Sequence, residues 1–95
     1  MPGYVVLESH VTDPEKYEQY RQLAVASIEQ YGGRFLVRGG NPQVLEGSWS
    51  PKRIVIIEFP SVGRATEWFH SPEYAPAKAL RKDAARVDMV AAQGV

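Results

Sequence analysis

Short runs of β-branched and aromatic residues alternate with helix-forming segments along this chain, and their order restricts the fold more than any other feature. Four runs are predicted to be strands, at residues 4–11, 34–38, 53–59 and 87–92. Helical segments should separate the first strand from the second and the third from the fourth. Residues 1–95 are therefore expected to form a single α+β domain in the order strand, helix, strand, strand, helix, strand.

The first predicted helix has recognisable ends. Asp13 can accept hydrogen bonds from the free amides at its start, and Pro14 suits its first turn. Gly32 and Gly33 should end it, because glycine readily adopts the left-handed conformation of a helix stop. The inward side is expected to carry Tyr17, Tyr20, Ala24, Ile28 and Tyr31.

The segment after the third strand should hold two helices. Ser61 can cap the first of them, which should end near His70 and carry Trp68 inward. The other should begin between Glu73 and Pro76, because proline has no amide hydrogen to give to a preceding turn.

This order predicts a ferredoxin-like sheet that is covered by helices on one face and bare on the other. Alternation along the strands places an apolar set on the bare face: Tyr4, Val6, Leu36, Ile54 and Ile56. A chain of 95 residues buries only about 65% of the surface that its unfolded form exposes, so it has little apolar surface to spare. We therefore expect a homodimer in which a second copy covers this face.

The same alternation places a charged set on the bare face: Glu8, His10, Arg34, Arg38 and Glu58. Antiparallel pairing of the second and third strands would bring Arg34 or Arg38 close to Glu58 or Glu8. One interpretation is a small polar site in which burial prepares His10 as a general base. The alternative, an ion-pair network that sets the register of a dimer, is favoured because such networks are commonly structural.

Composition argues against several other kinds of function. Lys and Arg together number 11, as do Asp and Glu, so no net charge attracts nucleic acid. The chain has no cysteine and only two histidines, which excludes the usual metal sites, and no glycine motif suits a phosphate-bearing cofactor. The longest apolar run, at 54–57, is too short to span a bilayer. We expect a cytoplasmic protein with no metal, no cofactor, no nucleic-acid partner and no membrane association.

Several segments together resemble a known family. They lie at residues 32–40, 44–53, 57–61 and 68–74, and they include the patterns Glu-Gly-x-Trp-x-Pro-x-Arg and Ser-Pro-Glu-Tyr. Over nearly its whole length the chain resembles the uncharacterised family named domain of unknown function 1330. The resemblance implies a dimeric α/β-barrel, within a superfamily that includes cofactor-free antibiotic-biosynthesis monooxygenases, muconolactone isomerases and stress-responsive proteins. It implies no established activity.

The resemblance also suggests candidate site residues. By likeness to the family pattern these are Arg38, Glu46, Arg53, Glu58 and Tyr74, with Trp49 and Trp68 as aromatic walls. Together with His10, they lead us to expect a small aromatic or carboxylate-bearing ligand near the loop at 39–53, whose flanking arginines supply planar donors. The enzymatic hypothesis is a cofactor-independent oxygenase or isomerase, and the alternative is a non-enzymatic ligand-binding or structural dimer. A general base on the pocket floor would favour the enzyme.

Overall fold

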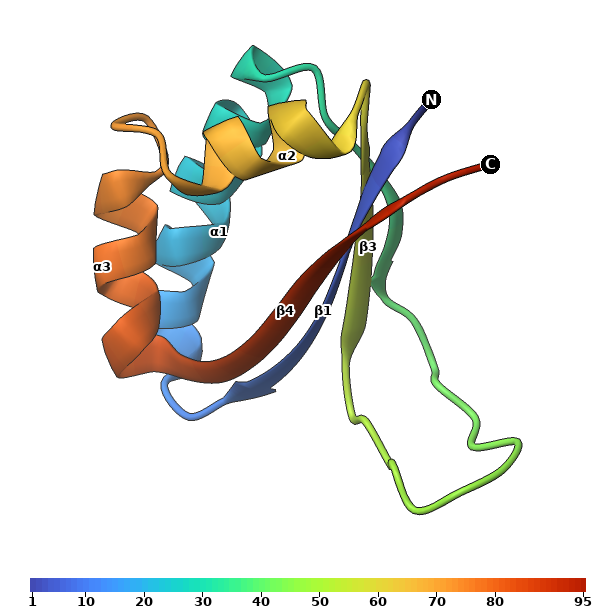
Figure 1. Ribbon diagram of the computed structural model, residues 1–95. Coiled ribbons are helices and arrows are strands. Elements are labelled where there is room, and N and C mark those ends of the chain that lie inside the picture. Colours follow the sequence, from blue (N-terminus) through green and yellow to red (C-terminus); the bar gives the residue numbers. More distant parts are fainter.

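Figure 1 shows the computed structural model of the protein, which describes residues 1–95. Its elements are β1 (Gly3–Val11), α1 (Pro14–Gln30), β2 (Arg34–Gly39), β3 (Ile54–Phe59), α2 (Val62–Phe69), α3 (Ala75–Ala84) and β4 (Ala85–Gln93). The strands form one sheet in the order β2-β3-β1-β4, and all three pairs of neighbours are antiparallel. The predicted ferredoxin-like α+β fold, with the first and third strands in the centre, is confirmed.

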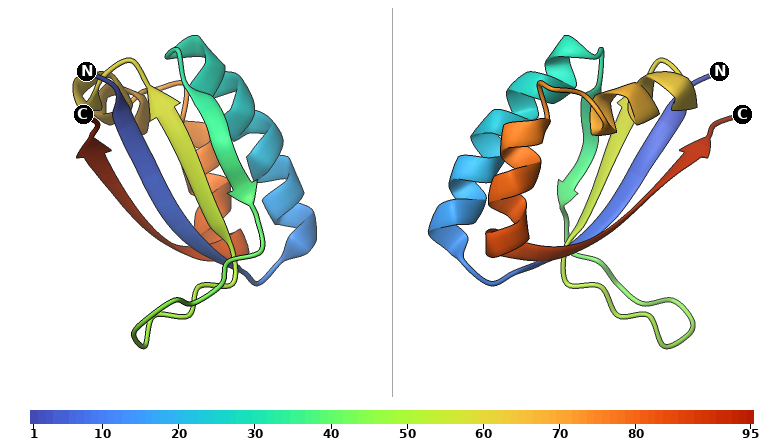
Figure 2. Two further views of the ribbon diagram at one scale, coloured as in Figure 1. Left: turned by 90° about the vertical axis from the view of Figure 1, so that its right-hand side faces the viewer. Right: turned by 60° about the vertical axis from the view of Figure 1, so that its left-hand side comes forward.

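All three helices lie on one face of the sheet, and the other face carries no element (Figures 1 and 2). The helices α1 and α3 pack side by side, whereas α2 crosses the end of the sheet that holds the two termini. The loop between β2 and β3 projects from the opposite end. It contains no strand.

The predicted helix ends are confirmed in atomic detail. Asp13 accepts a hydrogen bond from the backbone amide of Lys16 at 3.2 Å, and Ser61 accepts one from that of Arg64 at 3.0 Å. Gly32 follows α1 with φ of +78°, a conformation that favours glycine. Local sequence signals alone therefore determine where α1 and α2 begin and where α1 ends.

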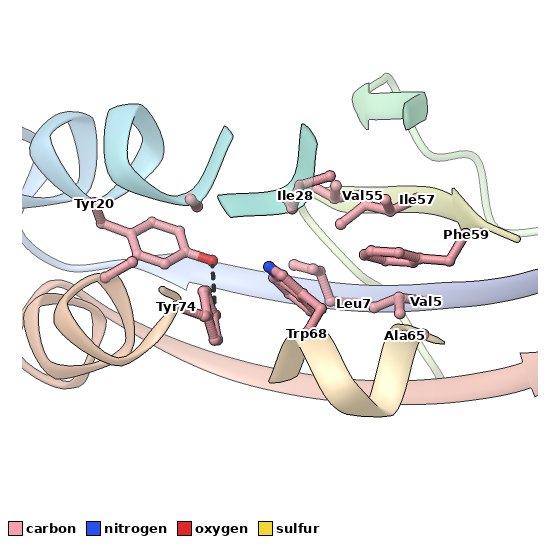
Figure 3. Close-up of a cluster of buried hydrophobic side chains, with 12 residues drawn as sticks. Val5, Leu7, Tyr20, Ile28, Val55, Ile57, Phe59, Ala65, Trp68 and Tyr74 are labelled. Atoms are coloured by element: carbon pink, nitrogen blue, oxygen red, sulfur yellow. Dashed lines mark hydrogen bonds between the residues drawn. The ribbon is translucent and has the colours of Figure 1, made fainter. Parts of the chain in front are cut away.

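The core lies between the helices and the sheet, and Trp68 is at its centre (Figure 3). The indole ring of Trp68 lies 4.3 Å from the ring of Tyr74 and 5.4 Å from that of Phe59, measured between centroids. Its Nε1 donates a hydrogen bond to Ser27 Oγ of α1 at 3.0 Å. One side chain of α2 thus joins the sheet, α1 and the segment leading into α3.

A bulge in β2 reverses part of the predicted alternation. Leu36 has no partner in β3, so beyond it Val37 lies opposite Ile56 and Arg38 lies opposite Val55. Arg38 therefore lies on the helix-covered face, and its predicted place on the bare face was wrong. Val37, which regular alternation would turn towards the helices, lies on the bare face opposite Ile56 instead. An extra residue shifts every later side chain to the other face because the side-chain period of a strand is two.

Candidate functional site

At one end of the bare face, Glu58 makes one of the ion pairs that alternation predicted, the one with Arg34. Arg34 Nε donates to Glu58 Oε1 at 2.8 Å, and the Tyr4 hydroxyl donates to Glu58 Oε2 at 3.0 Å. The bond from Arg34, followed by that from Tyr4, lowers the pKa of Glu58, and the bond to Glu58 raises the pKa of Tyr4. Both carboxylate oxygens are occupied, so this cluster suits a structural role better than proton transfer.

Replacing Glu58 by glutamine is expected to lower the melting temperature at neutral pH. The folded state depresses the pKa of Glu58, so the ionised carboxylate stabilises the fold above the usual glutamate pKa of about 4.3. That stabilisation is lost as the pH falls through the depressed value, so wild type and variant should converge in acid. Calorimetry between about pH 3 and pH 7 measures the difference.

Glu67→Gln is the matched control, because Glu67 forms an exposed pair with Arg64 three residues away on α2. This substitution should change the melting temperature little at any pH. If Glu58→Gln behaved like the control at neutral pH, the ion pair on the bare face would make no net contribution to stability.

The other candidates on the bare face lie apart from Glu58. Trp49 Nε1 donates to Glu8 Oε2 at 2.7 Å, which brings the β2–β3 loop to the edge of a shallow hollow that Val6 and Val90 also line. The Trp49 side chain is still 59% exposed. His10 is exposed near the end of β1 and makes no side-chain hydrogen bond. Neither the predicted general base nor Trp49 shares a pocket with Glu58.

On the helix-covered side, the bulge brings Arg38 to a small pocket beside Arg53. The pocket has a volume of about 30 Å³ and lies between α1 and the central strands. The Arg38 guanidinium lies 4.0 Å above the ring of Phe35, and that of Arg53 lies 5.7 Å from the ring of Tyr17. No carboxylate oxygen lies within 4.0 Å of either guanidinium, unlike the ion-paired arginines Arg21, Arg34 and Arg64. We call this site the arginine pocket.

A larger hollow lies beside α2, at the other end of the helix-covered side. This apolar cleft has a volume of about 200 Å³. Its principal lining residues are Val5, Ala65, Trp68, Phe69, Met89 and Ala91, and His70 lies where α2 ends. Only Trp68 among these was a candidate from the sequence. Met89 and Ala91 face the helices by alternation along β4, but their contact with α2 depends on how the helix crosses the sheet.

Tyr74 lies in the wall between the arginine pocket and the apolar cleft. It is fully buried, and its hydroxyl accepts a hydrogen bond from Arg81 Nη1 at 3.1 Å. The hydroxyl also lies 3.1 Å from that of Tyr20, a hydrogen bond drawn in Figure 3. Burial is the main cause that raises the pKa of both tyrosines, so both remain protonated near neutral pH. Tyr20 lines the arginine pocket and Trp68 lines the apolar cleft, so Tyr74 supports both walls.

The structure therefore separates the candidate residues that the sequence grouped. Arg38 and Arg53 share one pocket, and Trp68 and Tyr74 are in ring contact. His10, Trp49 and Glu58 belong to the opposite face, and Glu46 is exposed on the loop. No three His, Asp or Glu side chains are placed to hold a metal ion, and none of the helices is long and apolar enough to cross a bilayer.

Comparison with protein families decides the relationship that the sequence patterns suggested. Residues 2–95 match the family described as a domain of unknown function, DUF1330. The chain belongs to this family. The match confirms the resemblance, and since the DUF1330 description names no activity, it assigns none to the pockets. No curated protein matches the sequence.

Solved structures share the fold of this DUF1330 protein at low sequence identity. A protein of unknown function from Rhodopseudomonas palustris has a TM-score of 0.80 at 20% identity, over 99% of this chain and 82% of that one. A cofactor-independent oxygenase from Streptomyces nogalater has a TM-score of 0.70 at 12% identity, over 99% and 93%. A dimeric protein of unknown function with a ferredoxin-like fold from Bacteroides fragilis has a TM-score of 0.55 at 12% identity, over 98% and 96%. At such identities the likeness establishes the fold alone.

Proposed function

We propose that this protein is a homodimer that binds a small aromatic or carboxylate-bearing molecule on the helix-covered side of its sheet. The observation that carries the proposal is the apolar cleft beside α2, where Phe69 and the buried Trp68 beneath it form one wall and β1 and β4 form the floor. A concave, largely apolar site with aromatic walls is typical of small-molecule binding.

The bare face supports the dimeric part of the proposal. Its centre consists of apolar side chains on adjacent strands, with Val6 opposite both Ile56 and Val90, and Val37 opposite Ile56. Val90 is 64% exposed, and a contiguous apolar surface of this kind is usually covered. A solved structure of this fold is described as dimeric, which agrees with a second copy as the cover.

Two forms of this function are distinguished by chemistry in the cleft. In the enzymatic form the ligand undergoes cofactor-independent oxygenation or isomerisation, and in the other form it is only bound. The floor residues Val5, Met89 and Ala91 cannot exchange a proton, and the one imidazole, His70, is exposed at the end of α2. This composition favours binding without catalysis. Oxygen consumption in the presence of a bound phenol or quinol would favour the oxygenase.

Neutral aromatic molecules are expected to bind in the cleft and to change the fluorescence of Trp68. In a Trp49→Phe variant, Trp68 is the only tryptophan, and titration with 1-naphthol should give a saturable change. The reciprocal variant Trp68→Phe, which retains only Trp49 on the opposite face, should give none. A panel of phenols, quinols and aromatic acids extends the titration to other ligands.

Filling the cleft from its rim provides the control. Thr66 is exposed on α2 and lines the cleft, so Thr66→Phe should weaken 1-naphthol binding without disturbing buried residues. The neighbouring exposed residue Glu67 does not line the cleft, so Glu67→Phe should bind 1-naphthol as tightly as the protein without this substitution. Failure of every panel member to bind would contradict a ligand-binding function and leave a structural dimer.

A further inference from the structure

We infer that Arg38 and Arg53 together form a carboxylate-binding site for a planar aromatic acid, at the base of the β2–β3 loop on the helix-covered side. This inference goes beyond the proposed function, because it adds a second binding site, for acidic ligands, apart from the apolar cleft. It concerns the arginine pocket, which shares no lining residue with the apolar cleft.

The first observation is that both guanidiniums lack an anionic partner within the protein. Nε of Arg53 is buried and makes no hydrogen bond, although buried donors are nearly always satisfied. Arg38 is also free of any carboxylate within 4.0 Å, although it lies beside a second cation. Two neighbouring cations without a counter-ion repel each other, and an anion between them relieves both that repulsion and the unsatisfied Nε–H.

The second observation is that the backbone is shaped to bring these two side chains together. The bulge at Leu36 turns Arg38 onto the helix-covered face opposite Val55. Arg53 lies just before β3, two residues before Val55, so its side chain points to the same face, and it lines the arginine pocket together with Arg38.

Gly39, the residue after Arg38, leaves room for the side chain of Arg53 because it has no side chain of its own. Gly39 has φ of +87°, and a Cβ atom there would lie 2.6 Å from Nη1 of Arg53. A side chain at Gly39 would therefore strain the backbone and displace the guanidinium. The Arg53 guanidinium therefore lies against Gly39, with its Nε buried, and does not extend into solvent.

The shape of the site indicates a planar acid whose body lies towards the surface. The arginine pocket, at about 30 Å³, has room for little more than a carboxylate group. An outer hollow of about 290 Å³ borders it, and Arg21 and Arg38 line both. An aromatic ring in the outer hollow can stack on the Arg38 guanidinium, whose opposite side faces Phe35. The carboxylate then reaches inward to Arg53 and accepts charge-assisted hydrogen bonds.

Calorimetric titration with benzoate, and with benzamide as its neutral isostere, tests this assignment. Benzoate is expected to bind with a Kd of about 1 mM or tighter, and benzamide at least tenfold more weakly, because it brings no charge to the two cations. Arg38→Gln and Arg53→Gln should each weaken benzoate binding tenfold or more. Arg64→Gln is the matched control: Arg64 also stacks on an aromatic ring, at 4.3 Å from that of Tyr31, but already has Glu67 as its partner.

A second readout measures binding on the wild-type protein alone. In a ¹H–¹⁵N spectrum of the wild-type protein, the Arg53 Nε–H signal should shift on addition of benzoate, because the bound anion gives this donor its first acceptor. The signal is assigned by its absence from the spectrum of Arg53→Lys.

The outcomes separate this inference from the proposed function. If benzoate binds but neither arginine substitution weakens it and the Arg53 signal does not move, the inference is overturned and the proposed function stands. The same holds if 1-naphthol binds in the apolar cleft while benzoate does not bind at all. If benzoate, 1-naphthol and every other member of the panel fail to bind, both are overturned.

Discussion

Replacement of Trp68 by alanine is expected to lower the free energy of unfolding by about 3–5 kcal/mol, the usual loss when a buried Trp or Phe is truncated. The ring is fully buried between Phe59 and Tyr74, and its removal also deprives Ser27 Oγ of a hydrogen-bond donor. A domain of this size has only about 5–14 kcal/mol of total stability. Urea denaturation of Trp68→Ala, monitored by circular dichroism, should therefore have a much lower midpoint urea concentration than that of the wild type.

The second tryptophan of the chain is the control. Trp49 is 59% exposed and touches the sheet through one hydrogen bond to Glu8, so Trp49→Ala should cost less than about 1 kcal/mol. Equal losses from the two substitutions would mean that Trp68 is not the centre of the core.

Replacement of Ile56 by lysine is expected to convert the proposed dimer into a folded monomer. Ile56 lies at the middle of the bare face, flanked by Val6 and Val37 on the neighbouring strands. In a dimer that buries this face the new ammonium would be unpaired, which costs several kcal/mol, whereas in the monomer it would simply be solvated. Light scattering should give twice the chain mass of 10.6 kDa for the wild type and 10.6 kDa for the variant.

Ala79→Lys adds the same charge at an exposed position of α3 and should leave the mass doubled. The wild type must remain dimeric at micromolar concentration for the account to hold. A wild-type mass of 10.6 kDa that persisted on concentration would contradict the second copy as the cover of the bare face.

The elements of the fold were accessible from the sequence because each carries a local signal. Asp13 and Ser61 cap their helices through their own side chains, and the β-branched run at 54–57 predicts the strand that lies inside the sheet, between β2 and β1. The pairing of Arg34 with Glu58 also follows from alternation, because Arg34 precedes the bulge in β2 and its register with β3 is still regular. Local patterns are sufficient where no irregularity intervenes.

The candidate site was less accessible because it depends on that irregularity and on packing. A leucine at position 36 fits a regular strand as well as a bulge, so the sequence does not reveal the bulge. The bulge nevertheless decides on which face Arg38 lies. The apolar cleft depends on the angle at which α2 crosses β1 and β4, which no periodicity in the sequence specifies. Family likeness brought Arg38, Trp49 and Glu58 into one set, and only the three-dimensional arrangement separates them by face.

A crystal structure of the protein grown with benzoate tests the central claim most directly, because it shows which face of the sheet meets the ligand and which meets the second copy. The account predicts two chains joined through Val6 and Ile56, and in each chain a carboxylate held between Arg38 and the Nε of Arg53. Benzoate bound instead to the sheet face beside Trp49 and Glu8, with both arginines unoccupied, would contradict it.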